Sequence, residues 1–196
     1  MKRFSILAVL LCLLLSGCAS VSITPNNPST TPTGNTTSGA APKWGVQTKT
    51  SGCVVRGPLQ DTECTPGDIL PNVTKDQVCQ SGYASSVRNV TTSTKNKVYA
   101  EYDITHHTTG QYEVDHLVSL ELGGSNDISN LWPEAASPKP GFHEKDKVEN
   151  YLHDQVCSGA ISLQQAQIEI ATNWLHVYNT MPSSDKNSGS NDNGSP

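Results

Sequence analysis

Residues 112–132, YEVDHLVSLELGGSNDISNLW, constrain the fold of this chain more than any other segment. Apolar Tyr112, Val114 and Leu117 are interleaved with polar residues, a pattern typical of a half-buried strand. The letters GGSND that follow are a turn signal. NLWPE is a second short extended segment, which Pro133 must end or place at a sheet edge. The segment therefore predicts two short strands joined by a glycine-containing connection.

Helices are predicted after these strands. The run FHEKDKVENYLHDQVC has apolar residues at i, i+4 and i+8 and stops at Gly159, a residue that commonly follows a helix. The run SLQQAQIEIATNWLHVY starts at a capping Ser162 and also has apolar residues at helical spacing. The apolar positions of the two runs are Val148, Leu152 and Val156, then Leu163, Ala166, Ile170 and Trp174. A further short helix is expected from about Thr74, whereas residues 82–102 mix strand and helix signals. The fold class predicted is α+β, with a ββα unit at its centre.

Both ends of the chain are poor in large apolar residues. Residues 19–43 consist mainly of Ser, Thr, Pro, Asn and Gly, and the last fourteen residues read SSDKNSGSNDNGSP. Such segments cannot bury a hydrophobic core. We therefore expect one domain over residues 45–182, a flexible linker over 18–44 and a disordered tail over 183–196.

The first residues, MKRFSILAVLLCLLLSGC, join two basic side chains to a short apolar run, which is typical of an export signal. Leu15-Ser16-Gly17-Cys18 resembles the lipobox of bacterial lipoproteins. That resemblance implies cleavage after residue 17, a lipid on Cys18 and a protein anchored to the membrane with its domain outside the cytoplasm. The alternative is an uncleaved anchor helix with a chance cysteine.

Four cysteines remain once the signal is removed and Cys18 carries lipid. They are Cys53, Cys64, Cys79 and Cys157. An even number in an exported protein predicts two disulfides, with three possible connectivities. We favour Cys53 with Cys64, which closes a short segment, and Cys79 with Cys157, which closes a long one. No CxxC pair occurs, so a zinc site explains these cysteines less well.

The charge of the chain does not favour binding to nucleic acid. Removing Lys2 and Arg3 from the 13 basic residues leaves 11 against 18 acidic ones, a formal charge of −7. Bulk electrostatics therefore does not attract a polyanion. A local basic patch can still bind phosphate, because charges are screened over about 8 Å at physiological salt.

Asp115, His116 and Asn130 are the residues with the clearest chemical potential. An imidazole exchanges a proton near neutral pH, a carboxylate offers hard oxygen ligands to a divalent cation, and an amide can fix a neighbouring ring. Adjacent strand residues point to opposite faces, so Asp115 and His116 share a site only if the strand ends or bulges between them. We expect it to end there. Alternatively, His116 points into the core and Asp115 starts a turn.

The spacing of these residues resembles the HNH endonuclease signature. In DHLVSLELGGSNDISNLW, His116 precedes Gly123-Gly124 by seven and eight positions and Asn130 by fourteen. The match spans about twenty residues, or about forty-five with the helix that follows. More loosely, most of the domain resembles small exported bacterial proteins with an HNH-like core.

The resemblance implies a ββα-metal core that hydrolyses phosphodiester bonds of nucleic acid, with DNA as the expected substrate. It implies that His116 is the general base, Asp115 a metal ligand and Asn130 the residue that orients the base. The expected cofactor is a divalent ion, Mg²⁺ or Mn²⁺ first, with Zn²⁺ or Ni²⁺ as alternatives. The chain departs from the signature at the third position. His143 is the first candidate for this metal ligand and Glu149 the second, and Lys145 is a candidate for phosphate binding.

Other basic residues support two interpretations. Phosphate contacts are possible from Arg88, Lys95 and Lys97 or from Lys139, Lys145 and Lys147, but each group also fits a solvated surface. His106 and His107, in a Thr-rich segment, are expected to be exposed. The rival function is a non-catalytic surface lipoprotein that uses the ββα unit as a binding or structural scaffold. The acidic charge and the uncertain third ligand favour that rival.

Overall fold

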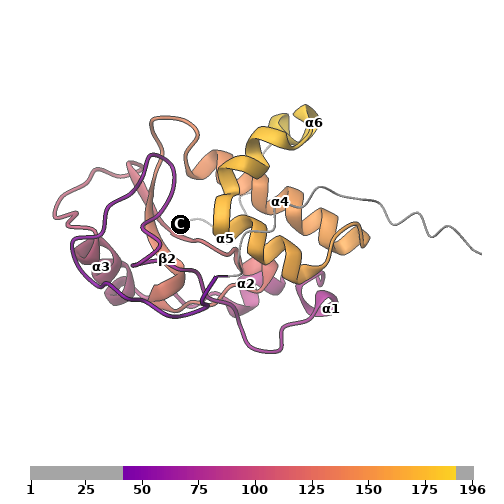
Figure 1. The fold of residues 1–196 in the computed structure, drawn as a ribbon, viewed down its shortest axis with the longest axis horizontal. Helices are drawn as coiled ribbons and strands as arrows, with labels where there is room; N and C mark the ends of the chain where they lie inside the picture. Colours follow the sequence, from indigo (N-terminus) through magenta and orange to yellow (C-terminus); the bar gives the residue numbers. More distant parts are fainter. Residues whose placement is uncertain (1–41, 189–196) are drawn as a thin grey trace, which may run out of the picture. The chain divides into compact units, whose positions relative to one another are not determined.

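The computed structural model describes residues 42–188 as helices around a small sheet (Figure 1). The strands are β1 (Tyr112–His116) and β2 (Leu131–Ala135), with two 3₁₀ turns between them, η1 (Leu120–Leu122) and η2 (Ile128–Asn130). The helices are α1 (Lys75–Val78), α2 (Tyr83–Val87), α3 (Thr92–Glu101), α4 (Phe142–Ser158), α5 (Leu163–Thr180) and α6 (Ser183–Asn187). The α+β class is therefore confirmed. The expected signal segment and Cys18 lie outside the described residues.

The two strands pair antiparallel in a regular register. Asp115 lies opposite Trp132, and His116 lies opposite Leu131. Strand β1 runs through both Asp115 and His116, so the expectation that it ends between them is wrong. Since side chains alternate along a strand, Asp115 and His116 point to opposite faces of the sheet.

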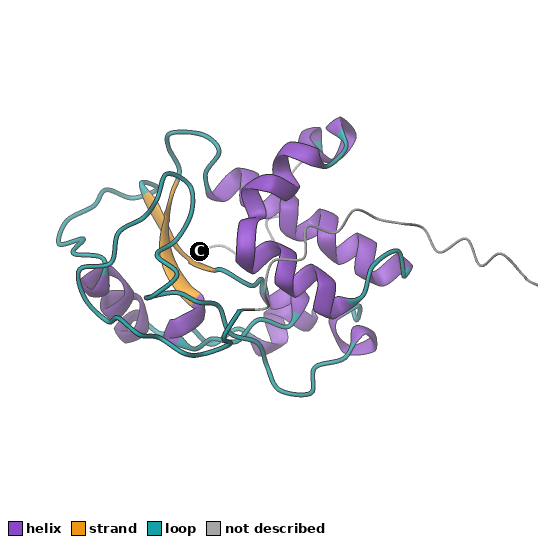
Figure 2. Ribbon diagram, in the orientation of Figure 1, coloured by secondary structure: helices purple, strands orange, loops and turns teal. Residues whose placement is uncertain are grey.

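Each face of the sheet is covered by different helices, as Figure 2 shows. On one face Val114 and Leu131 pack with Val98 of α3 in a small apolar cluster. On the other face Trp132 belongs to the main core. That core is completed mostly by α4 and α5, whose buried apolar side chains include Val148, Leu152, Val156, Ala166, Ile170 and Trp174. The sheet thus lies between α3 and the α4–α5 pair.

The helices begin and end much as expected. Thr74 and Gln77 form a capping box at α1, and the Ser162 hydroxyl accepts a hydrogen bond from the Gln165 amide at the start of α5. Helix α4 ends at Gly159, which has a φ of +85°. Helix α5 is kinked at Asn173, whose φ of −166° is not helical. Residues 82–102, which the sequence left open, form α2 and α3.

The described residues form two disulfides, and they are the pairs that the sequence favoured. Cys53 bonds to Cys64, and Cys79 bonds to Cys157 across a separation of 78 residues. The second bond fixes the residue after α1 to the last turns of α4. Closing so long a loop removes considerable conformational entropy from the unfolded chain.

The folded region extends beyond the boundary expected at residue 182. Helix α6 occupies residues that the sequence assigned to the tail. It contacts α4, where the Lys147 ammonium donates a hydrogen bond to the Lys186 carbonyl over 2.7 Å. Among the described residues, no helix has the length and apolarity needed to cross a bilayer.

Candidate functional site

Gly123 and Gly124, which follow β1, lie where two backbone segments approach too closely for a side chain. Gly123 has a φ of +76°, a conformation that side chains disfavour. A Cβ added at Gly124 would lie only 1.8 Å from the carbonyl oxygen of Val118. The pair therefore lets the connection between the strands fold back tightly on the segment that follows β1.

The buried side chain of Asn130 forms hydrogen bonds with the backbone of this connection. Its side-chain oxygen accepts hydrogen bonds from the backbone amides of Val118, over 2.9 Å, and Asp68, over 3.2 Å. Its side-chain nitrogen donates to the carbonyls of Val118, over 3.0 Å, and Ser125, over 2.9 Å. The side chain is fully buried, so all four polar contacts are made within the protein. Asn130 thus braces the loop and acts on His116 only through the backbone.

We expect Asn130→Ala to lower the free energy of unfolding by about 2 to 3 kcal/mol, because it leaves buried backbone groups without partners. Urea unfolding followed by tryptophan fluorescence measures this loss. Asn96→Ala, at an exposed position of α3, is the matched control and should change stability by less than about 0.5 kcal/mol. Equal losses in the two variants would contradict the bracing role.

On the face of the sheet toward α4, Lys145 meets two of the predicted metal ligands. Its ammonium lies 2.7 Å from Asp115 Oδ2 and 2.7 Å from the His116 carbonyl oxygen, and it also contacts Glu149 Oε1. These contacts use all three of its N–H donors. The Lys145 side chain has no exposed surface. It therefore has no donor left for a phosphate group in this arrangement.

Glu134 completes what we call the carboxylate–lysine cluster, which consists of Asp115, Glu134, Lys145 and Glu149. Glu134 is 1% exposed, and among the described residues no donor reaches either of its carboxylate oxygens. Burial raises its pKa well above the usual value, and neighbouring Asp115 raises it further. A protonated Glu134 is placed to donate a hydrogen bond to Asp115. Sequence reasoning missed Glu134, although the letters NLWPE place it two residues after the buried Trp132, on the same face.

The charges in this cluster stabilise one another against burial. Burial opposes ionisation of Asp115, but the Lys145 ammonium holds the pKa of that carboxyl below its usual value. For Glu149, burial dominates and raises the pKa to about 8, although Lys145 opposes the shift. Burial also disfavours the Lys145 charge, yet the surrounding carboxylates raise its pKa well above the ordinary value. Lys145 is therefore the resident cation of the cluster.

The cluster does not fit a divalent ion in this arrangement. The ammonium stands where Asp115 and Glu149 would share a metal, and in the described part of the chain the only convergent group of three potential ligands is elsewhere. His143 is exposed at the start of α4 and packs against Phe142, with ring centroids 4.2 Å apart. Of the predicted ligands, the structure thus brings together Asp115 and Glu149 around Lys145, and leaves His143 on the surface.

His116 has a separate environment on the opposite face. Its Nε2 lies 3.2 Å from Asn126 Oδ1, while Asn126 Nδ2 donates to the Val87 carbonyl over 2.8 Å. Because that second bond turns Oδ1 toward the ring, Nε2 carries the hydrogen and Nδ1 the lone pair of the neutral imidazole. Burial lowers the pKa of His116 to about 4, although Asp115 opposes the shift, and Arg88 lowers it further. Sequence reasoning missed Asn126, which lies in the turn GGSND.

The buried neutral state of His116 should make stability depend on pH. Its folded pKa of about 4 lies below the value of about 6.5 for an unfolded chain. Between these values the unfolded chain binds more protons, so the folded state loses stability as pH falls through this window. The loss is on the order of 3 kcal/mol. Urea unfolding measures the free energy of unfolding of wild type and of His116→Gln at several pH values from 7 to 4. We expect the difference in this free energy, wild type minus variant, to become smaller as the pH falls. A difference that stays constant with pH would show that His116 is not buried in its neutral form.

The basic residues near the sheet differ in their surroundings. Arg88, which follows α2, is exposed, and its positive charge lowers the pKa of both His116 and Glu121. Lys139 pairs with Glu144 over 3.2 Å. Lys95 and Lys97 lie on α3, and His106 and His107 are exposed, the latter with its ring 4.3 Å from that of Tyr99. Of the candidate phosphate contacts, Arg88 is exposed and its charge acts on His116, whereas Lys145 has its three donors occupied.

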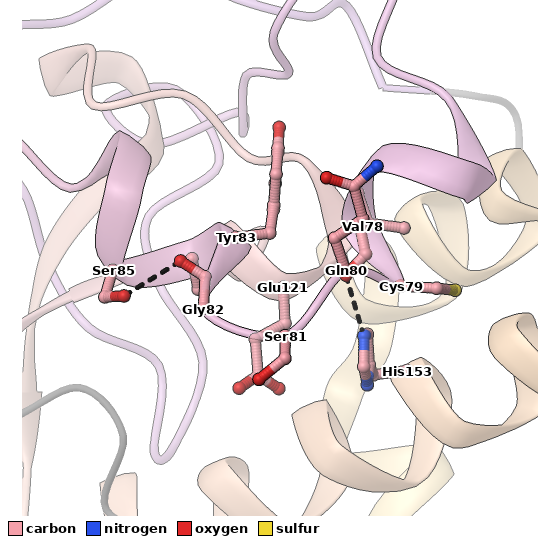
Figure 3. A pocket seen from close by; sticks show the side chains of 10 residues that line it. Val78, Cys79, Gln80, Ser81, Gly82, Tyr83, Ser85, Glu121 and His153 are labelled. Atoms are coloured by element: carbon pink, nitrogen blue, oxygen red, sulfur yellow. Dashed lines mark hydrogen bonds between the residues drawn. The ribbon is translucent and has the colours of Figure 1, made fainter.

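A second group includes the longer disulfide. Cys79, His153 and Cys157 bring their potential ligand atoms within 4.8 Å of one another, and the two sulfurs become available to a metal ion only when the bond between them is reduced. Cys79 and His153 also line a pocket of about 320 Å³ whose walls come from α1, α2, η1 and α4 (Figure 3). Glu121 lines the same pocket, and burial raises the pKa of its carboxyl.

Comparisons with protein-family models, curated proteins and solved structures found no match. Any function must therefore be argued from the residues and their geometry.

Proposed function

We propose that this protein hydrolyses phosphodiester bonds of nucleic acid, as an HNH-type endonuclease with His116 as its general base. The observation that carries the proposal is the state of His116. It is a neutral imidazole held in one tautomer by Asn126, with the exposed guanidinium of Arg88 nearby. In-line attack of water on a phosphodiester needs a group that accepts a proton and a cationic group near the phosphate.

In the proposed reaction His116 Nδ1 takes a proton from water, and the resulting hydroxide attacks phosphorus. The bond from phosphorus to the 3′ oxygen breaks, the leaving 3′ oxygen takes a proton from solvent water, and His116 then returns its proton to solvent. Arg88 binds the nonbridging oxygens and offsets their charge. Asp115 contributes by position, since its Oδ1 accepts a hydrogen bond from the His116 amide over 2.7 Å and so fixes the backbone that carries the base.

No step of this reaction is assigned to a metal ion, because the present arrangement of the carboxylate–lysine cluster does not fit one. The HNH signature implies a divalent ion, and binding one between Asp115 and Glu149 would require Lys145 to leave its three partners. The cleavage assay therefore measures directly whether the reaction depends on a divalent ion.

We further propose that the enzyme acts outside the cytoplasm, anchored through lipid on Cys18. The proposal is supported by the export-type start of the sequence and by two disulfides, which persist in oxidising compartments. Tethered in this way, the domain would meet nucleic acid arriving from outside the cell.

The proposal is tested with the chain 19–196, purified with both disulfides formed, and incubated with supercoiled plasmid or single-stranded RNA. Parallel reactions contain Mg²⁺, Mn²⁺ or EDTA. We expect nicked or shortened products on at least one substrate. Absence of cleavage on both substrates under all three conditions would reject the nuclease.

Two observations favour a second function, a non-catalytic lipoprotein that uses the strands and α4 as a scaffold. His116 is only 2% exposed, so water must enter the structure to reach its ring. The carboxylate–lysine cluster also joins β1 to α4 through contacts within the protein. This function predicts binding of a partner without turnover, and the cleavage assay separates the two.

A further inference from the structure

The longer disulfide lies next to a histidine that is placed as a metal ligand. His153 and Cys157 are four residues apart on α4 and therefore lie on one helix face. Cys79 follows α1 and reaches the same point from the other side. Cys157 Sγ lies 3.4 Å from His153 Nε2. Two sulfurs and an imidazole nitrogen from two elements thus meet at one place, apart from the proposed nuclease site.

We infer that Cys79, Cys157 and His153 form a zinc site when a dithiol reductant opens their disulfide. The inference does not depend on the proposed nuclease function, because none of the three residues contacts His116 or the carboxylate–lysine cluster in the described contacts. The disulfide and the zinc-bound dithiolate are two alternative states of the same three residues.

The distances agree with tetrahedral coordination. With Zn–S near 2.3 Å and Zn–N near 2.0–2.1 Å, a sulfur and a nitrogen ligand lie about 3.5 Å apart, and two sulfurs about 3.8 Å. The separation of 3.4 Å between Cys157 Sγ and His153 Nε2 already meets the first requirement. The Cα atoms of Cys79 and Cys157 are 5.6 Å apart. Rotation of the two side chains is therefore enough to place the reduced sulfurs about 3.8 Å apart.

The exchange balances in electrons and protons. A dithiol gives two electrons and two protons to the Cys79–Cys157 bond and becomes a cyclic disulfide. Zinc then replaces the two thiol protons, which leave to solvent. His153 Nε2 now donates to the Val78 carbonyl over 3.0 Å, so on binding zinc it gives up that hydrogen and Nδ1 carries one instead.

The two disulfides differ in their access to a reductant. Cys53 is 5% exposed and Cys64 has no exposed surface, so their bond is enclosed in the core. Cys79 and Cys157 are both half-buried, and Cys79 borders the pocket. Limited reduction should therefore open the Cys79–Cys157 bond first and leave the core disulfide closed.

Three protein ligands leave a fourth zinc position for water or a small anion. In the view of Figure 3, His153 lies between Cys79 and Glu121, and all three line the pocket of about 320 Å³. The open position faces this pocket, as in zinc sites that keep an exchangeable ligand. Glu121 lines the same pocket but is not one of the three ligands.

The test uses the chain 19–196, oxidised or reduced with a phosphine that is then removed without air. Zinc is titrated against a chromophoric chelator, and Co²⁺ is added in parallel to detect thiolate-to-metal absorption. We expect one zinc per reduced chain, none per oxidised chain, and a higher melting temperature of the reduced chain with zinc. A reduced chain that unfolds must refold when zinc is added, and failure of zinc to raise its stability would overturn the inference.

Variants locate the site. His153→Ala should weaken zinc binding by at least about tenfold in the reduced chain, although all thiols remain. The pair Cys79→Ser and Cys157→Ser, which keeps Cys53 and Cys64, should abolish it. Glu121→Gln is the matched control and should bind zinc like the wild type. Zinc binding that survives the double serine variant, or that ignores His153→Ala, would place the metal on other groups and refute the site.

Discussion

Lys145→Met is expected to lower the free energy of unfolding by about 3 to 5 kcal/mol. The side chain has no exposed surface, and its ammonium contacts Asp115, Glu149 and the His116 carbonyl. Methionine fills similar volume but supplies no charge, so the Asp115 carboxylate would remain buried without a cation, and Glu149 would lose its ammonium partner. Glu134, which no donor among the described residues reaches, would then face an unpaired carboxylate instead of an ion pair. Urea unfolding at pH 7 measures the loss.

Two comparisons make this result specific to the cluster. Lys147→Met changes the same residue type on the same helix, but Lys147 is only half-buried, and we expect a loss below about 1 kcal/mol. Combining Lys145→Met with Asp115→Asn removes the stranded charge, keeps an oxygen for the His116 amide, and should restore more than about 1 kcal/mol. Losses of similar size for Lys145→Met and Lys147→Met would show that Lys145 is not an interior counter-ion.

The second large effect concerns activity. His116→Ala should reduce the rate of phosphodiester cleavage by about 10²- to 10⁴-fold, the usual contribution of a general base. Within residues 42–188 its ring makes one hydrogen bond, to Asn126, so the hairpin should remain paired in the variant. Circular dichroism and the urea midpoint confirm that the comparison is between folded proteins.

His143→Ala is the informative control for this experiment. The family resemblance makes His143 the first candidate for the third metal ligand, whereas the structure leaves it exposed beside Phe142. We expect the variant to cleave within about threefold of wild type, as for a surface substitution. A loss comparable to that of His116→Ala would show that α4 rearranges and brings His143 into the site.

Local sequence patterns predicted most of the fold. Alternating residues located β1, the spacing of Val148, Leu152 and Val156 located α4, and the favoured cysteine pairs are those that form. The strand and helix signals depend only on residues close together in the sequence, and four cysteines can pair in only three ways. Residues 82–102 could not be assigned because α3 has little separation of polar and apolar faces, so its helical state depends on packing against the strands.

The candidate site was harder to predict because it depends on contacts distant in sequence. The motif indicated Asp115 and His116, but not that β1 stays regular through both and sends them to opposite faces. Lys145 reaches Asp115 across thirty residues, and nothing local marks it as a buried counter-ion. Glu134 and Asn126 act through burial and hydrogen bonding, which appear only once α4 and α2 are in place.

The measurement that most directly tests the central claim is the initial rate of nicking of supercoiled plasmid by wild type and His116→Ala at pH 7. Both chains carry residues 19–196 with disulfides formed, and each is assayed with Mg²⁺, with Mn²⁺ and with EDTA. We expect the wild type to nick in at least one condition and His116→Ala to be at least a hundredfold slower there. Equal rates in two folded proteins would contradict the role of His116 and leave the strands and α4 as a scaffold.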